Sequence, residues 1–363
     1  MKNTRLLQTV GVASLAAIAL TGCSSADSSS SSASGSGLSG TLNATGASSQ
    51  EKAQLNGWIP GYKKIESGVT VNYTSTGSGT GRENFIAGSS DFIGSDRAYK
   101  TSEIADSTFP LCTAGTSLVE FPAYISPIAI AYNLPGVDEL KLDGETLAKI
   151  YAGKITTWND SAIAALNEGV DLPDTKINAV HRGDKSGTTG NFLAYLTEAA
   201  PDVWTYGDED EFPGDLGGAS ADKTAGVAAE VQNGEGSIGY LDASAATQLQ
   251  TASIKSGSDF VAYSPEAAAE VVAGSPLEDG REATDVVKKL DYTGVEGAYP
   301  IVLVSYLIGC SDYADDSKAE LVKSYFSYVI SDDAQKAAAA EAGNAPLSDD
   351  LRQDAQAAID AIK

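Results

Sequence analysis

The sequence HRGDKSGTTGNF, residues 181–192, lies between two segments that predict different secondary structure. Residues 177–180 before it are predicted to form a strand, and Phe192, Leu193 and Leu196 recur after it at the spacing of a helix. A strand that passes through a short polar turn into a helix is a repeating unit of α/β folds. In such folds ligands bind where strands end and helices begin, so this turn is also a candidate binding site.

The same alternation runs along the rest of the chain. Further strands are predicted at residues 69–73, 91–94, 121–133, 237–240 and 299–307, and the longest of them is interrupted by Pro122 and Pro127. Further helices are predicted at residues 82–87, 143–151 and 334–342. The alternation predicts an α/β fold with mostly parallel or mixed sheets, and a chain of this length is long enough for two domains.

The turn at residues 181–192 carries groups that can hold a small tetrahedral anion. The backbone N–H groups of Ser186, Gly187 and Thr188 are expected to lack partners at the helix start, where the helix dipole adds partial positive charge. Arg182 adds a planar guanidinium, and Asp184 is close enough in sequence to hold it in position. The alternative is that Ser186 or Thr188 only caps the helix and that Arg182 is an ordinary surface charge.

A second cluster of glycines and hydroxyls, TGSGTGR at residues 76–82, contains Ser78 and precedes another predicted helix. Asp96 follows the strand predicted at residues 91–94. An ionised carboxylate can only accept hydrogen bonds, so Asp96 beside an anion would favour an oxyanion that carries a proton, such as hydrogen phosphate, over sulfate. Alternatively, Ser78 is a turn residue and Asp96 is a helix cap or a turn residue.

The chain is strongly acidic, with a formal net charge of −25, and this charge excludes some classes of function. Nucleic-acid binding needs a basic surface, so no nucleic-acid partner is predicted. The net charge would also repel an anion, so any attraction must come from local groups. His181 is the single histidine and no Cys-x-x-Cys pair is present, which excludes a multi-histidine metal site; no metal and no cofactor are predicted.

The N-terminus predicts export and anchoring by a lipid. Lys2 and Arg5 precede an apolar run, residues 10–20, that is too short to span a bilayer comfortably. The run ends in LTGC, the pattern of a bacterial lipobox, which predicts a signal peptide at residues 1–22 and lipid on the thiol of Cys23. Residues 23–40, rich in serine and glycine, are predicted to be a flexible tether. The protein would then lie on the outer face of the cytoplasmic membrane, in the cell envelope.

Two cysteines, Cys112 and Cys310, follow this N-terminal segment. Outside the cytoplasm a pair of cysteines usually forms a disulfide, so a bridge between them is predicted. The alternative is two unpaired buried thiols.

Together these motifs resemble the phosphate-binding lipoproteins of bacterial ABC-type phosphate importers. The similarity runs from about Gly46 to the C-terminus, and its strongest segments are residues 73–82, 91–96 and 181–195. It implies a two-lobed periplasmic-binding-protein fold of type II, which is an α/β fold with mixed sheets, helices on both faces and a two-stranded hinge. Lobe I would comprise residues 41–124 and 295–363, and lobe II would comprise residues 125–294.

The resemblance also implies which residues bind phosphate. These are Ser49, Gln50, Ser78, Asp96, Arg182, Ser186, Gly187 and Thr188. Asp96 would accept the proton of the ligand, Arg182 would be its charge partner and Asp184 would brace Arg182. In the first loop, which would contribute the Ser49 hydroxyl and the Gln50 backbone N–H, the chain has ASSQEK at residues 47–52 where the family usually has a small residue followed by Thr-Phe-Pro. A shift of the alignment by one residue would make Ser48 the hydroxyl donor instead of Ser49.

The function implied by the resemblance is transport without catalysis. The protein would be a monomer that captures inorganic phosphate between its lobes and delivers it to a membrane permease, held at the membrane by the lipid on Cys23. One alternative is a binding protein for another oxyanion, such as sulfate or molybdate. The other is a secreted phosphatase or serine hydrolase that uses Ser186 or Ser78. No Gly-x-Ser-x-Gly elbow is present and His181 is the only imidazole, which disfavours an enzyme.

Overall fold

The computed structural model describes residues 37–363. The predicted signal peptide, the predicted lipid site Cys23 and most of the predicted tether lie outside the described residues. The last residues of that predicted tether, Ser39 and Gly40, already belong to the first strand. Within residues 37–363 no helix is long and apolar enough to cross a membrane.

Strands and helices alternate along much of the described chain, which ends in three consecutive helices. The strands are β1 (Ser39–Gly46), β2 (Gly68–Ser75), β3 (Phe92–Ser95), β4 (Leu118–Tyr132), β5 (Lys141–Leu142), β6 (Asn178–Arg182), β7 (Ala219–Ala221), β8 (Ser237–Asp242), β9 (Gln250–Thr251), β10 (Ser253–Ser256), β11 (Asp259–Val261) and β12 (Val302–Cys310). The helices are α1 (Ile59–Ile65), α2 (Ser78–Ile86), α3 (Thr101–Asp106), α4 (Gly144–Tyr151), α5 (Ser161–Leu166), α6 (Gly187–Ala199), α7 (Lys223–Asn233), α8 (Pro265–Gly274), α9 (Asp316–Val329), α10 (Asp332–Ala342) and α11 (Asp349–Asp360), and a π-helical turn at Ala53–Trp58 precedes α1.

Most strands belong to one mixed sheet of nine strands, in the order β2-β1-β3-β12-β4-β8-β6-β7 with β9 beside β4. Strand β1 is parallel to β2 and β3, and β6 is parallel to β7 and β8. Strand β12 is antiparallel to β3 and β4, and β4 is antiparallel to β8. A small sheet, in the order β11-β10-β5, lies apart from this path.

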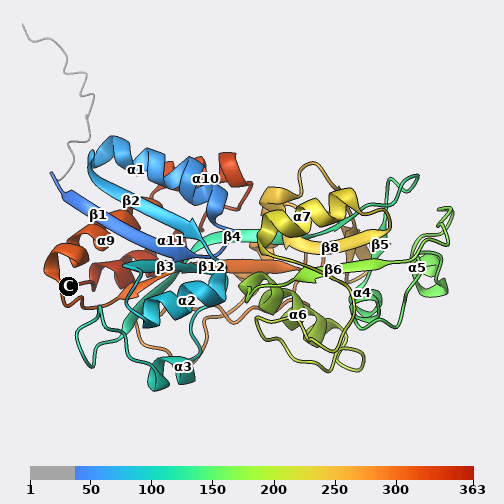
Figure 1. Ribbon diagram of the computed structural model, residues 1–363, viewed down its shortest axis with the longest axis horizontal. Helices are drawn as coiled ribbons and strands as arrows, with labels where there is room; N and C mark the ends of the chain where they lie inside the picture. The colour runs from blue at the N-terminus through green and yellow to red at the C-terminus, as the bar shows by residue number, and fades with distance from the viewer. Residues whose placement is uncertain (1–36) are drawn as a thin grey trace, which may run out of the picture. The chain divides into compact units, whose positions relative to one another are not determined.

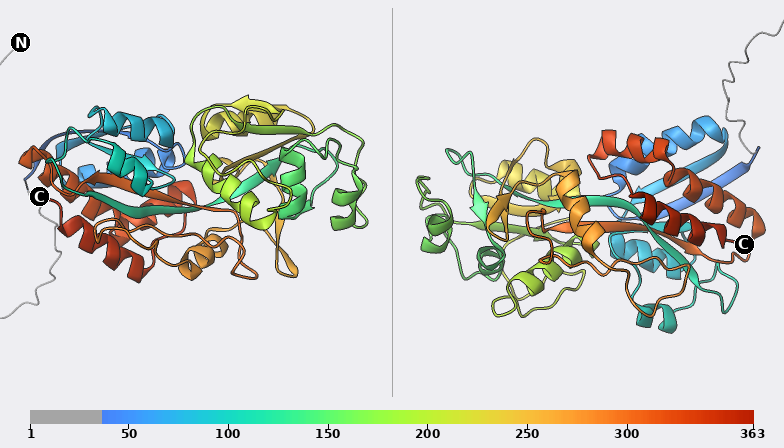
Figure 2. Two further views of the ribbon diagram at one scale, coloured as in Figure 1. Left: turned by 90° about the horizontal axis from the view of Figure 1, so that it is seen from below. Right: turned by 180° about the vertical axis from the view of Figure 1, so that it is seen from behind.

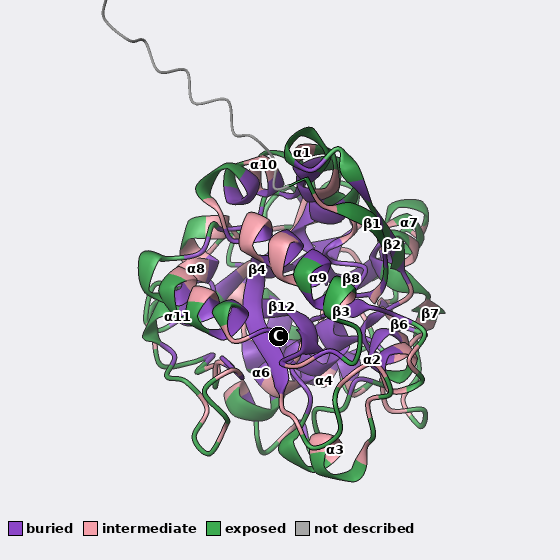
Figure 3. Cartoon of the chain, turned by 90° about the vertical axis from the view of Figure 1, so that its left-hand side faces the viewer, coloured by how far each residue is buried: buried purple, intermediate pink, exposed green. Residues whose placement is uncertain are grey.

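Helices cover both faces of the large sheet. Figure 1 shows α1 and α10 on one side of β1–β3 with α2 on the other, and α7 and α6 on opposite sides of β6 and β8. The views in Figure 2 show the same layers from below and from behind. Buried residues concentrate on β4 and β12 in the middle of the sheet, whereas the outer surfaces of the helices are exposed (Figure 3). The predicted α/β class with mixed sheets and helices on both faces is confirmed.

Strand β4 is the longest strand and changes its partner along its length. Its first part pairs with β12, from Leu118 to Pro127, and its last part pairs with β8, from Ile128 to Tyr132. All of its residues are buried. The sequence predicted an interruption at Pro122 and Pro127, and the structure instead shows one continuous strand.

Both prolines stand where the sheet ladder is irregular. The register between β4 and β12 shifts opposite Ala123, which follows Pro122, because Tyr306 pairs with Pro122 while Ser305 pairs with Tyr124. Pro127 is the last residue of β4 that pairs with β12. Since proline cannot donate to a ladder, bulges and the ends of a pairing are the places where a strand tolerates it.

The helix predicted at residues 82–87 starts earlier, at Ser78. Its glycines are used for close packing: a Cβ on Gly81 would lie 2.7 Å from the Cα of Gly46, and one on Gly79 would lie 2.4 Å from the Cβ of Lys185. Tertiary packing therefore overrides the low helix propensity of glycine here.

The predicted boundaries of the two lobes stay a prediction. One segment shows why the chain is hard to divide. Arg281 donates to the carbonyl oxygen of Tyr99 at 2.8 Å, and the N–H of Glu120 donates to Thr284 at 3.0 Å, although residues 281 and 284 were predicted to belong to lobe II. A few residues later, the Tyr292 hydroxyl donates to Asn191 in α6 at 3.0 Å.

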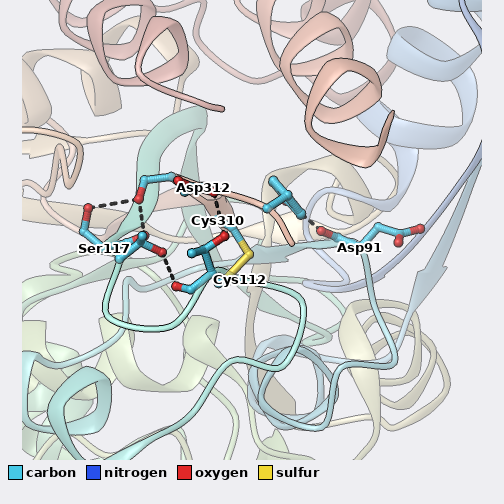
Figure 4. Close-up of a disulfide and its surroundings, with 9 residues drawn as sticks. Asp91, Cys112, Ser117, Cys310 and Asp312 are labelled. Carbon is cyan, nitrogen blue, oxygen red and sulfur yellow. Dashed lines mark hydrogen bonds between the residues drawn. A yellow bond between two sulfur atoms is a disulfide. The ribbon is translucent and has the colours of Figure 1, made fainter. Parts of the chain in front are cut away.

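Cys112 and Cys310 form the predicted disulfide, with their Cα atoms 5.3 Å apart (Figure 4). The alternative of two unpaired thiols is wrong. The bridge ties the loop before β4 to the end of β12, and a hydrogen bond of 2.7 Å from the Thr113 hydroxyl to Asp312 lies beside it. The two cysteines are 198 residues apart, so the bridge closes most of the described chain into a loop.

Replacing both cysteines by serine is expected to lower the free energy of unfolding, because the unfolded chain regains the entropy that the long loop restricts. The expected loss is about 2–5 kcal/mol, measured by urea denaturation. The wild-type protein unfolded in the presence of a reducing agent is the control and should match the double variant. Equal stability of the oxidised protein and the double variant would show that the bridge does not stabilise the fold.

Candidate functional site

The segment at residues 181–192 forms the predicted strand, turn and helix. Strand β6 ends at Arg182, and α6 begins at Gly187 with Ser186 as its N-cap, whose hydroxyl accepts the Thr189 N–H at 3.4 Å. One expectation about this turn is wrong. The backbone N–H of Ser186 is not free, because it donates to the carbonyl oxygen of Asp210 at 2.8 Å.

Arg182 and Asp184 are paired through two hydrogen bonds. The Nε atom of Arg182 lies 2.7 Å from Asp184 Oδ1, and a terminal nitrogen lies 2.5 Å from Oδ2. The Lys223 N–H also donates to Asp184, at 3.0 Å. Burial raises the pKa of Asp184, but the hydrogen bonds and positive charge of Arg182 outweigh burial and hold the pKa below its usual value. The carboxylate therefore fixes the guanidinium, which is itself almost fully buried.

Asp96 is the centre at which the predicted site residues meet. Its Oδ1 atom accepts hydrogen bonds from the hydroxyls of Ser49 and Ser305, the latter at 2.7 Å, and its Oδ2 atom accepts from the Thr188 hydroxyl at 2.9 Å. The backbone N–H of Asp96 donates to the Ser78 hydroxyl at 3.1 Å. Asp96 is only 2% exposed. Residues that are far apart in the sequence thus surround one buried carboxylate.

Burial of Asp96 increases its affinity for a proton, whereas its hydrogen-bond donors and a nearby positive charge decrease it. Burial raises the pKa of Asp96 above its usual value, and the hydroxyls of Ser49, Ser305 and Thr188, with the positive charge of Arg182, act against this rise. Hydroxyl donors stabilise the ionised carboxylate, because an ionised carboxylate can only accept. The three hydroxyls are therefore arranged around a carboxylate that accepts hydrogen bonds.

The start of α6 packs directly against Asp96. A Cβ atom on Gly187 would lie 2.8 Å from the Cβ of Asp96 and 3.1 Å from its backbone, so only glycine fits this approach. Asn191, one turn further, donates to the carbonyl oxygens of Asp96 at 2.7 Å and Gly187 at 2.8 Å. The helix start that was predicted to hold an anion and the carboxylate that was predicted to accept its proton are therefore neighbours.

Three polar residues of the first loop, Ser48, Ser49 and Gln50, have different partners. The Ser49 hydroxyl donates to Asp96, whereas the Ser48 hydroxyl lies 3.0 Å from the hydroxyl of Thr224. The side-chain amide of Gln50 is buried and donates to the Ser305 hydroxyl at 2.7 Å. The structure thus brings Ser49, and not Ser48, to the carboxylate.

Sequence reasoning missed several residues of this region: Ser305, Asn191, Thr224 and Asp210. Ser305 left a weak signal, as a lone serine in the apolar run of β12. Asp210 lies in a loop between α6 and β7 that had no recognisable motif. Such contacts depend on the tertiary fold, so no local sequence pattern predicts them.

Asp210 connects the start of α6 to α2. Its carboxylate forms a buried ion pair with Arg82 and accepts a hydrogen bond of 2.9 Å from Arg97, while its carbonyl oxygen accepts the N–H of Ser186. The side chains of Arg82 and Asp210 are 6% and 8% exposed. The side chain of Asp210 therefore binds α2 and its backbone carbonyl binds the start of α6, so Asp210 holds these two segments together.

The remaining titratable candidate, His181, is engaged in packing. Its ring stacks on Phe212 with the centroids 4.2 Å apart, and its Nδ1 atom lies 3.0 Å from the Arg182 carbonyl oxygen. Between residues 37 and 363 no group of three or more His, Cys, Asp or Glu side chains is placed to hold a metal ion. The chemistry that the site offers is hydrogen bonding to a buried anion.

Comparison with known proteins gives related chains over almost the whole length. A family model described as the PBP superfamily domain matches residues 31–333. The phosphate-binding protein PstS 2 of Mycobacterium tuberculosis H37Rv is 36% identical over 332 residues, 88% of this chain and 87% of that protein. PstS3 of Mycobacterium bovis BCG is 34% identical over 378 residues, 100% of both chains. A solved high affinity periplasmic phosphate-binding protein with bound phosphate has a TM-score of 0.73 at 19% identity, covering 88% of this chain and 93% of its own, which supports the fold.

Replacing Arg82 by glutamine is expected to destabilise the fold, because it leaves the buried carboxylate of Asp210 with only Arg97 as a cationic partner. Breaking a buried ion pair costs about 3 kcal/mol or more, and urea denaturation measures the loss. Lys149→Gln is the control, because Lys149 forms an exposed pair with Glu145 and should change stability little. Equal effects of the two substitutions would contradict the role assigned to Arg82.

Proposed function

The chain belongs to the PstS family of phosphate-binding proteins within the PBP superfamily, and we propose that it binds inorganic phosphate and delivers it to the membrane permease of an ABC importer. The observation that carries this proposal is the buried carboxylate of Asp96, held by hydroxyl donors beside the start of α6. A buried anion requires many fixed donors, because an unpaired buried charge is very costly.

The donors for phosphate come from the residues around Asp96. The hydroxyls of Ser49 and Thr188 can rotate from Asp96 toward a phosphate oxygen, since a hydroxyl directs its single proton to whichever acceptor is present. Further donors are the hydroxyls of Ser78 and Ser186, the N–H groups of Gln50, Gly187 and Thr188, and the guanidinium of Arg182. Asp96 then accepts the proton that hydrogen phosphate still carries.

Closure of two lobes completes the site in this proposal. Lobe I comprises residues 41–124 and 295–363, and lobe II comprises residues 125–294. The hydrogen bond between Thr188 and Asp96 joins the two, and β4 and β12 are the strands at the crossing. Bending at these strands would open the site, as in hinge-bending binding proteins.

The protein works at the membrane surface in this proposal. A lipid on Cys23 and the tether up to residue 40 hold a monomer at the outer face of the cytoplasmic membrane. The disulfide between Cys112 and Cys310 supports an oxidising location outside the cytoplasm. Phosphate is bound and released without chemical change, in keeping with relatives that are phosphate-binding proteins.

Replacing Arg182 by alanine is expected to lower the affinity for phosphate by about 100-fold or more, because it removes the buried positive charge and leaves Asp184 unpaired. Isothermal titration calorimetry measures the loss. His181→Ala is the control and should change the affinity little, since His181 packs on Phe212. Similar losses in both variants would mean that Arg182 is not the anchor.

Replacing Asp96 by asparagine is expected to weaken discrimination between phosphate and sulfate, because the asparagine amide can donate to an oxyanion that has no proton. Burial raises the pKa of Asp96. When the pH falls through that pKa, the Asp96 carboxyl of the wild type becomes protonated and can also donate to an oxyanion that has no proton. Sulfate affinity should therefore rise as the pH falls in the wild type and stay nearly constant in the variant. Competition titrations across pH measure this; equal binding of sulfate and phosphate by the wild type at neutral pH would refute the proton-acceptor role.

A further inference from the structure

A chain of hydrogen bonds runs from Tyr325 in α9 to Asp96. The Tyr325 hydroxyl donates to the side-chain oxygen of Gln54 at 2.6 Å, and the Gln54 amide donates to the side-chain oxygen of Gln50 at 3.0 Å. The Gln50 amide donates to the Ser305 hydroxyl at 2.7 Å, and Ser305 donates to Asp96 Oδ1 at 2.7 Å. All five residues are buried.

The direction of this chain is fixed by its neighbours. The Gln50 amide nitrogen also lies 3.0 Å from the carbonyl oxygen of Tyr306, which can only accept a hydrogen bond. The amide oxygen of Gln50 must therefore face Gln54. Since Ser305 accepts from Gln50, its single proton is available for Asp96. Every donor in the chain points toward the carboxylate.

The fold places Ser305 at this position through the pairing of β12 with β3. Strand β12 lies beside β3, where Tyr306 pairs with Ser95, the residue before Asp96. On the other side of β12 the register with β4 shifts between Ser305 and Tyr306, where Ala123 is the extra residue of β4. Ser305 is 0% exposed, so water cannot replace its hydrogen bond.

Ser305 differs from the other two hydroxyls on Asp96. Ser49 and Thr188 are proposed to turn toward phosphate when it binds. The oxygen of Ser305 accepts from Gln50, so its proton points away from Gln50 and donates to Asp96. Ser305 is therefore the donor that remains on Asp96 when the ligand is present.

We propose that Ser305 is a positioning residue that keeps Asp96 an ionised acceptor, and thereby determines over which pH range the site prefers phosphate to sulfate. Gln50, Gln54 and Tyr325 support it by fixing and polarising its hydroxyl. This inference rests on the proposed phosphate function of Asp96. It assigns to the side chain of Gln50 a role separate from its expected backbone contact with the ligand.

Other titratable groups near Asp96 also respond to pH. Arg182 stabilises the ionised form of Asp96. The negative charge of Asp96 in turn contributes to raising the pKa of the Asp242 carboxyl and of the Tyr73 and Tyr124 hydroxyls. Burial raises the pKa of Asp242 to about 6, so Asp242 titrates in an accessible range. The experiment must therefore report on Asp96 itself.

The test is Ser305→Ala in the full chain, titrated with inorganic phosphate between about pH 5 and pH 8.5 by calorimetry. One lost hydrogen bond to a buried charge raises the pKa of Asp96 by about one unit. The ratio of the variant Kd to the wild-type Kd cancels the titration of phosphate. We expect this ratio to be near unity at high pH and to rise to about tenfold at low pH, with sulfate gaining affinity over the same range.

Three further variants separate positioning from a structural role. Ser305→Thr keeps the hydroxyl and should restore the wild-type profile. Tyr325→Phe removes only the first donor of the chain, far from the ligand, and should shift the profile in the same direction by less. Ser311→Ala removes another buried serine, which donates to the Ser117 carbonyl oxygen, and should not shift it. A loss of phosphate affinity that is equal at every pH in Ser305→Ala, or no loss, would overturn the inference.

Carbon-detected NMR of the Asp96 carboxyl separates this inference from the proposed function. The pKa of Asp96 should rise in Ser305→Ala whether or not phosphate is present. If the wild type fails to bind phosphate while the pKa still rises, the proposed function is wrong and the role of Ser305 as a donor to Asp96 stands. An unchanged pKa in a protein that binds phosphate would refute the role of Ser305 alone.

Discussion

The carboxylate of Asp96 is buried, and a buried charge is tolerated only when polar groups surround it. Those groups come from the loop after β1, from the start of α6 and from β12. The sheet order β1-β3-β12 places Ser49 and Ser305 on either side of Asp96, and α6 closes the remaining side. The need to satisfy one anionic side chain therefore fixes the relative positions of segments that are far apart in sequence. In the proposed function, the same donors would also serve a second anion that shares a proton with Asp96.

The parts of this arrangement that were visible in the sequence are those with local causes. The strand, turn and helix at residues 177–199 followed from apolar spacing and from a polar turn, and Ser186 caps the helix as its residue type favours. The disulfide followed from the number of cysteines and the predicted export. The pairing of Arg182 with Asp184 needed only two residues of separation.

The parts that were not visible depend on the tertiary fold. Ser305 is 209 residues from Asp96, and its place beside Asp96 depends on the pairing of β12 with β3, which no sequence pattern marks. The Ser186 N–H was expected to be free, but it donates to Asp210 in a distant loop. The helix α2 begins inside a glycine-rich segment because the glycines allow contacts with Gly46 and Lys185, which propensity does not consider. In each case a distant partner decides the local structure.

In the proposed function, a strongly acidic protein has to bind an anion through the direction of its hydrogen bonds. With a formal net charge of −25, long-range attraction cannot favour phosphate over other solutes. Short-range donors act only after the anion has arrived, and they distinguish ligands by the number and position of their protons. Selectivity of this kind would depend on which way each hydroxyl and amide points, so the proposed site includes residues such as Ser305 that do not contact the ligand.

Strand β4 has a mechanical consequence for the molecule. Pro122 and Pro127 leave two points in a fully buried strand without an N–H donor, and the ladder is irregular at both points. Sliding the strand by one residue would set a proline against a carbonyl oxygen that needs a donor, and burial would make the loss expensive. The strand is thus locked against translation, while the same two points carry fewer cross-strand bonds to resist flexing. In the proposed two-lobed protein, β4 would therefore favour rotation of one part of the sheet over slippage of the strand.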